Sequence, residues 1–254
     1  MDQAAPGPRT GSSVPSVDRS RRLQLLVAVL SVLAGSADVI SFLGLAGLFC
    51  AHITGNLVIL AAHLVTGTPG TVALLLSVPV FILVLALTRL LAAGLDAVGV
   101  ASLRPLLGLQ LLLLVAMLTL GVTVGPHPDP DAAIVIGAGM LGVAAMAVQN
   151  ALVQLALPGA PPTAVMTSNL TRAVLDVGEV LVGRERAAVA TARRRAARTW
   201  PVIVGFVGGA AVGAAWFAAA GLASLALPVG LALLALVLSL GPAPHRRRPT
   251  GTPT

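Results

Sequence analysis

Two short stretches of this sequence place polar side chains inside long apolar segments. The first contains Thr54 and Asn56, with His52 just before it, and the second contains Thr167 and Asn169. In lipid, such side chains line a polar path or join neighbouring helices by hydrogen bonds. Both stretches follow the pattern Thr-x-Asn-Leu, and we expect each to break its helix locally. A break frees backbone groups that a cavity or other parts of the protein must satisfy.

Asp38 is the acidic residue within the apolar body of the first half of the chain. A carboxylate at the centre of a membrane helix costs about 2.5–3.5 kcal/mol on insertion scales, so it should face the interior of the bundle or a water cavity. This predicts a proton or cation site. The alternative is a structural polar contact, or a position near the membrane interface. Asn150, in the second half, either lines the same cavity opposite Asp38 or bonds to another helix.

The second stretch is followed by Arg172 and Asp176, which are spaced to pair with each other on a helix. Both lie on the same helix face as Asn169. We interpret this face as a charged wall or gate of a central site. The alternative is an amphipathic helix at the cytoplasmic interface, with its charges among lipid headgroups.

Arginines are concentrated between residues 184 and 198. Each arginine near an anionic membrane surface contributes about 1 kcal/mol, which makes Arg193, Arg194 and Arg195 candidate contacts to lipid headgroups. The alternative is that they only set the topology of the chain.

Other chemistry is not indicated by the sequence. It has no phosphate-binding loop, nucleophile elbow, HExxH motif or CxxC pair, and Cys50 is its single cysteine. His52 and His63 would lie about 16 Å apart on a helix, too far to share a metal ion. We therefore expect no metal, no cofactor and no enzymatic activity.

The distribution of charge indicates the class of protein. All sixteen basic residues are arginine, and no charged residue occurs between Val39 and Thr88 or between Thr199 and Gly241. This pattern predicts an all-α, polytopic transmembrane helical bundle whose partner is the lipid bilayer. No polar domain is left to bind nucleic acid, despite the net charge of +7. The oligomeric state is left open.

The expected organisation is one transmembrane domain over residues 23–241, between a disordered tail (1–22) and a basic tail (242–254). Its apolar segments are 23–45, 46–66, 71–95, 105–124, 132–157, 162–181, 199–222 and 224–241. Arginine-rich segments favour the cytoplasm, which places both termini and the 184–198 loop there. Every loop falls on its preferred side if 46–66 and 162–181 are broken or re-entrant. This predicts six crossings plus two broken segments; eight crossings remain the alternative.

The two Thr-x-Asn-Leu stretches also indicate an internal repeat, with halves of about 23–124 and 132–241. Each half then holds three crossings and one broken segment. An odd number of crossings inverts one half relative to the other, an arrangement that recurs in secondary transporters and channels.

Residues 35–43 (GSADVISFL) and 49–56 (FCAHITGN) resemble the signature of the YoaK-like proteins, as do residues 149–152 (QNAL) and 163–171 (TAVMTSNLT). These are bacterial multi-pass membrane proteins grouped as a domain of unknown function. The resemblance covers about residues 23–241. Ser168 stands where the family often has glycine. The resemblance implies a plasma-membrane location and supplies no activity.

The favoured function is a small-solute permease, either passive or coupled to protons. Six residues would line its central site: Asp38, His52, Asn56, Asn150, Asn169 and Arg172. The alternative is a non-transporting membrane protein that interacts with lipid or with a protein partner.

Overall fold

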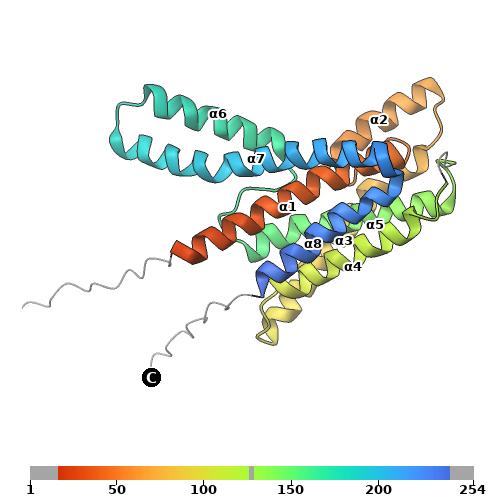
Figure 1. Ribbon diagram of the computed structural model, residues 1–254, viewed down its shortest axis with the longest axis horizontal. Coiled ribbons are helices and arrows are strands. Elements are labelled where there is room, and N and C mark those ends of the chain that lie inside the picture. Colours follow the sequence, from red (N-terminus) through yellow and green to blue (C-terminus); the bar gives the residue numbers. More distant parts are fainter. Residues whose placement is uncertain (1–16, 126–128, 241–254) are drawn as a thin grey trace, which may run out of the picture.

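The computed structural model describes residues 17–125 and 129–240, and within these ranges it is helical with no strand (Figure 1). In chain order the elements are α1 (Val17–Gly44), α2 (Ile53–Thr66), α3 (Thr71–Ala97), α4 (Leu103–Gly121), α5 (Ala133–Ala156), α6 (Met166–Val182), α7 (Arg186–Ala220), the 3-10 helix η1 (Gly221–Leu225) and α8 (Ala226–Ser239).

Five stretches of the described chain are long and apolar enough to cross a membrane. They are Arg21–Gly44, Thr71–Ala97, Leu103–Gly121, Ala133–Ala156 and Arg186–Ser239. The last stretch holds both α7 and α8, which η1 separates. The apolar helix α2 has 14 residues, or about 21 Å at 1.5 Å per residue. The helical membrane bundle predicted from the distribution of charge is confirmed.

Two expected boundaries are wrong. The disordered tail was expected to extend to residue 22, but α1 already begins at Val17. The arginine-rich segment 184–198 was expected to be a loop, but α7 begins at Arg186 and runs for 35 residues. Alanine and arginine, which dominate the first turns of α7, are among the best helix formers, so the charge of this segment does not prevent a helix. Residues 1–16 and the basic tail 242–254 lie outside the described residues.

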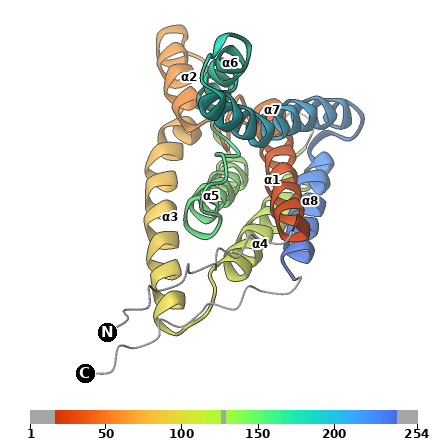
Figure 2. The ribbon, with the colours of Figure 1, turned by 90° about the vertical axis from the view of Figure 1, so that its left-hand side faces the viewer.

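Helix α5 lies at the centre of the bundle, with α1, α3 and α4 around it (Figure 2). Its residues from Gly142 to Gln149 are all buried. Met146 packs with Leu33 and Ile40 of α1, Leu74 of α3 and Met117 of α4 in one apolar core. This core fixes the long helices that hold the two broken segments.

Helices α1 and α7 cross very closely, because glycines face the neighbouring backbone at the crossing. A Cβ atom on Gly209 would clash with the carbonyl oxygen of Val32, and one on Gly35 would clash with that of Phe206. Gly205, Gly209 and Gly213 recur every four residues, the small-residue spacing that lets helices approach in lipid. The crossing holds α7 against the part of α1 that carries Asp38.

The short helices α2 and α6 begin near the middle of the bundle and run to opposite ends (Figure 1). Their first turns are the ends nearest to each other, and both helices lie on the same side of the molecule (Figure 2). The start of α1, the α3–α4 connection, the α6–α7 corner and the end of α8 lie at one end of the bundle. The predicted segments 46–66 and 162–181 are helical only from Ile53 and Met166 onward.

Candidate functional site

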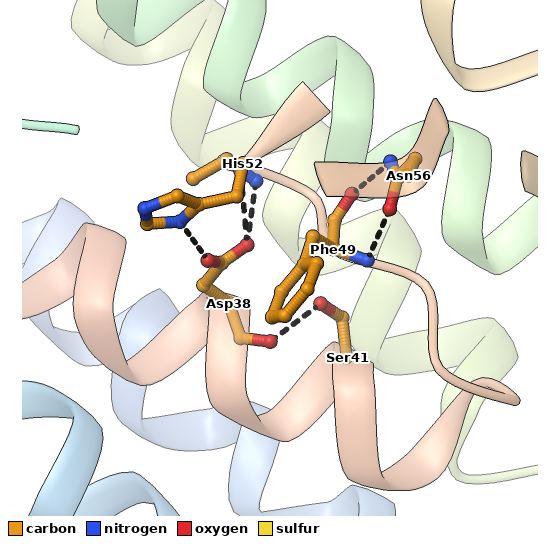
Figure 3. Close-up of polar contacts among 6 residues, drawn as sticks. Asp38, Ser41, Phe49, His52 and Asn56 are labelled. Atoms are coloured by element: carbon orange, nitrogen blue, oxygen red, sulfur yellow. Dashed lines mark hydrogen bonds and ion pairs between the residues drawn. The ribbon is translucent and has the colours of Figure 1, made fainter. Parts of the chain in front are cut away.

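Asp38 holds the first broken segment against α1. Its carboxylate is 3% exposed, and its Oδ1 accepts hydrogen bonds from the backbone N–H of Ala51 at 2.7 Å and of His52 at 3.4 Å. Its Oδ2 lies 2.5 Å from His52 Nδ1, within hydrogen-bonding distance (Figure 3). The chain therefore returns along α1 as far as Asp38 before α2 begins.

The His52 ring is only partly covered, with 39% of its side chain exposed. It packs edge-on against Phe206 of α7, with the ring centroids 5.5 Å apart. It also lies 5.7 Å from Phe49, which stacks on Phe42. The Asp38–His52 pair thus joins α1, the loop before α2, and α7, while one side of the imidazole stays accessible.

Asn56 closes the first break from inside α2. Its Nδ2 donates to the carbonyl oxygen of Phe49 at 2.8 Å, and its Oδ1 accepts from the N–H of the same residue at 2.9 Å (Figure 3). The side chain is fully buried. Both of its polar groups are therefore occupied by the backbone seven residues earlier.

Asn169 makes the corresponding contact in the second break, but with one hydrogen bond instead of two. Like Asn56, it is the fourth residue of a short helix and is fully buried. Its Nδ2 donates to the carbonyl oxygen of Pro162, also seven residues earlier, at 2.6 Å. Proline has no N–H to donate, and Asn169 Oδ1 has no hydrogen-bond partner. The second break is thus held by one bond where the first is held by two.

A buried amide network fastens the second break to the bundle. Gln149 of α5 donates from Nε2 to Thr163 Oγ1 at 2.8 Å and to the Leu30 carbonyl oxygen at 2.9 Å. Gln110 of α4 donates to Gln149 Oε1 at 2.6 Å, which leaves Gln110 Oε1 buried without a partner. Ser31 of α1 lies 3.4 Å from the Thr163 carbonyl oxygen. Thr163, three residues before α6, therefore touches α1 and α5.

Both breaks are fastened to α1, and the first also contacts α7. On α1, Ser31 and Asp38 are seven residues apart, or roughly 10 Å along the axis. On α7, Val202 accepts a 2.5 Å hydrogen bond from Ser31, and Phe206 contacts His52. The starts of α2 and α6 are thereby held at neighbouring levels of the bundle.

A family model for proteins of unknown function, DUF1275, matches residues 26–238. The chain belongs to this family. The resemblance to the YoaK-like proteins seen in the sequence agrees with that match. No curated protein and no solved structure matches the chain. No matched protein therefore supplies an activity or a ligand for this DUF1275 chain, and both must be inferred from its own residues.

The other predicted site residues lie apart from this centre or on its surface. Thr54, Thr167 and Arg172 are exposed. Asn150 is half-buried, and its Nδ2 donates to the Met146 carbonyl oxygen one turn earlier on α5. His52 lies before α2, so it does not form a continuous helical stripe with Asn56 and His63.

The expected pairing of Asp176 is wrong. Asp176 is 5% exposed and binds Arg195 of α7, with two guanidinium nitrogens at 2.9 and 2.6 Å from its Oδ1. Arg172 is one turn away but points to solvent. Packing of α6 along the first half of α7 turns Asp176 toward its neighbour. Arg195, a predicted lipid contact, is thus engaged by a carboxylate, while Arg193 and Arg194 remain exposed.

Two hollows are present in the described part of the DUF1275 chain. One, of about 480 Å³, lies among Leu43, Gly121, Phe217 and Leu222 near one end of the bundle. The other, of about 620 Å³, lies at the α6–α7 corner. Neither is lined by Asp38, His52, Asn56 or Asn169.

The network around Gln149 was not predicted as part of the site. The sequence offers one signal, a cluster of amides in an apolar segment at residues 149, 150 and 154, of which only Asn150 is a predicted site residue. The partners of Gln149 are distant in sequence: Thr163 is 14 residues away, Gln110 is 39 and Leu30 is 119. Only the fold brings them together.

Proposed function

We propose that this chain is a small-solute permease of the plasma membrane whose central site lies where α2 and α6 begin. The observation that carries the proposal is the pair of short helices whose first turns lie nearest each other near the middle of the bundle, each preceded by a segment that is bonded to α1. Broken helices that meet at the membrane midplane form the binding sites of many transporters, since their ends offer unpaired backbone groups.

The same geometry supports two inverted repeats, α1–α4 and α5–α8. Asn56 and Asn169 occupy the same position in α2 and α6, and each bonds a residue seven positions earlier. With the arginine-rich end in the cytoplasm, both termini are cytoplasmic and six helices cross the bilayer. Relative movement of the repeats would open the centre to one side at a time.

Proton coupling would use the Asp38–His52 pair. Asp38 holds the loop before α2 by accepting from Ala51 and His52, and a protonated carboxyl group accepts hydrogen bonds more weakly. Proton uptake would therefore loosen this loop and favour opening. The accessible groups nearest the starts of the short helices would meet the solute first: the partly exposed His52 and the exposed Thr54 and Thr167.

The test is flux into proteoliposomes that contain the purified chain, with a broad panel of labelled metabolites and with or without a proton gradient. We expect uptake of at least one solute, stimulated by the gradient. The variant Asp38→Asn should lose the stimulation, whereas Glu185→Gln, which removes an exposed acid outside the centre, should retain it. No uptake across the panel would refute the permease. Equal stimulation in Asp38→Asn would refute the role of Asp38.

A second candidate is a non-transporting protein that binds lipid or a protein partner. It is favoured by the outer face of α6, where Leu170, Val174, Leu175, Leu181 and Val182 are between 49% and 79% exposed. Absence of flux together with association through this face would support it. We infer no catalytic activity in either case, since the sequence pairs no nucleophile with a base.

A further inference from the structure

A hollow at the α6–α7 corner gathers four arginine side chains. Arg184 and Arg186 belong to the turn and the start of α7, and Arg193 and Arg194 lie two turns further along the helix. The hollow measures about 620 Å³, and all four arginines are exposed to solvent. The neighbouring Arg195 points instead toward Asp176. One arginine of the corner, Arg195, therefore has a structural role, and the other four surround the hollow.

No ion pair joins the four arginines to an acid within the described residues, and they outnumber the acids at this corner, Glu185 in the turn and Glu179, whose carboxylate lies beside Gly183. The ion pairs there are Asp38–His52 and Asp176–Arg195, and neither involves the hollow. Arg194 donates only to the hydroxyl of Thr191, at 3.3 Å. Like charges gathered around one space repel each other, and an anion in that space removes the repulsion.

The backbone at the start of α7 also contributes positive potential at the hollow. Glu185 is the N-cap of α7, and its side chain makes no capping bond to the first N–H groups of the helix, which starts at Arg186 of the hollow. A helix N-terminus carries partial positive charge and favours anions. Guanidinium groups bind phosphate oxygens in a two-pronged geometry that a lysine cannot reproduce.

We propose that this hollow binds a phosphate group, carried either by an anionic lipid headgroup or by a soluble phosphate compound. The site is independent of the proposed solute path, because Arg184, Arg186, Arg193 and Arg194 make no contact with Asp38, His52 or Asn169. It lies at the end of the bundle that also holds the start of α1 and the end of α8.

The test measures ligand-induced thermal stabilisation of the full chain in a neutral detergent, followed by the fluorescence of Trp200 and Trp216. Three probes are compared: phosphatidylglycerol in mixed micelles, phosphatidylcholine in the same micelles, and inorganic pyrophosphate. The variant R193Q/R194Q is matched by R89Q/R198Q, which removes two exposed arginines outside the hollow. R193K/R194K keeps the charge but loses the two-pronged geometry.

We expect phosphatidylglycerol to bind roughly tenfold or more weakly to R193Q/R194Q than to the unmodified chain or to R89Q/R198Q. R193K/R194K should lie between them, and it serves as the readout if R193Q/R194Q does not fold. Stabilisation by phosphatidylglycerol alone assigns the hollow to a lipid headgroup, and stabilisation also by pyrophosphate assigns it to the phosphate group itself. Equal stabilisation by phosphatidylcholine, or equal loss in R89Q/R198Q, overturns the proposal, as does no stabilisation by either phosphate probe.

Discussion

At the scale of single residues, the two asparagines differ in what they hold. Asn56 satisfies both backbone groups of Phe49, whereas Asn169 satisfies one group of Pro162 and keeps a buried oxygen without a partner. A buried acceptor without a partner costs about 1–3 kcal/mol. The second break is therefore the weaker of the two, and the difference originates in one proline.

Asn56→Ala should destabilise the protein more than Asn169→Ala does. The first variant loses two hydrogen bonds and leaves a part-buried N–H and C=O unpaired, for a cost of about 2–4 kcal/mol. The second loses one bond and removes an unpaired oxygen, so we expect about 1 kcal/mol. Thermal unfolding in detergent measures both. Asn150→Ala, which loses one bond within α5, is the control. Equal losses in the two short helices would contradict the assignment.

The effect of Pro162→Ala on the free energy of unfolding should be more favourable when Asn169 is present than when it is replaced by alanine. The variant supplies an N–H to Asn169 Oδ1, as Phe49 does for Asn56, but it also loses the restriction that proline places on the unfolded chain. A double-mutant cycle with Asn169→Ala cancels the second effect. We expect a favourable coupling of about 1 kcal/mol between the new N–H and the asparagine. A coupling of zero would show that the two groups do not meet.

At the scale of elements, the contact of α1 with α7 sets the positions of both breaks. On α1, Ser31 bonds to the segment before α6, and Asp38 bonds to the segment before α2. On α7, Val202 bonds to Ser31, and Phe206 packs against His52. The glycines of α7 allow this because they bring the two backbones together. A change that separates the helices should therefore disturb both breaks at once.

Gly209→Ala tests this crossing, and Gly208→Ala is its matched control. The added methyl group clashes with the Val32 backbone at position 209, whereas nothing lies within 4 Å of it at position 208. We expect Gly209→Ala to lower the free energy of unfolding by about 1–3 kcal/mol. Gly208→Ala should be neutral or slightly stabilising, because alanine favours helix. Similar melting temperatures for the two variants would rule out a close crossing.

At the scale of the whole molecule, the path of the chain predicts which segments share a side of the membrane. The arginine-rich α6–α7 corner and the α3–α4 connection lie at one end of the bundle, and the α2–α3 connection lies at the other. Arginine is retained on the cytoplasmic side of membranes. The two ends should therefore be accessible from opposite sides.

Cysteines introduced one at a time at positions 68 and 186 should react with a membrane-impermeant maleimide from opposite sides of the membrane. Thr68→Cys should react from outside, and Arg186→Cys only after permeabilisation. The native Cys50 is fully buried and serves as the unreactive background. If α2 crossed the whole bilayer, as the eight-crossing alternative requires, position 68 would be protected until the cells are opened.

The sequence alone determines that this chain is a helical membrane bundle, because apolar segments of about 20 residues without charges can be buried only as helices in lipid. It also indicates where two of those segments break, since Asn56 and Asn169 stand in repeated motifs within apolar surroundings. Its local charge pattern was less informative about α7, where arginines proved compatible with a continuous helix.

The tertiary structure alone decided which polar groups meet. Asp176 binds Arg195 rather than Arg172, and Gln149 reaches Leu30 and Thr163, because helix packing sets side-chain direction and brings together residues that are distant in sequence. It also decided that both asparagines bond to backbone seven residues earlier. Residue spacing along a helix identifies partners only within that helix. These partners lie in the segment before the helix or on another helix, where periodicity carries no information.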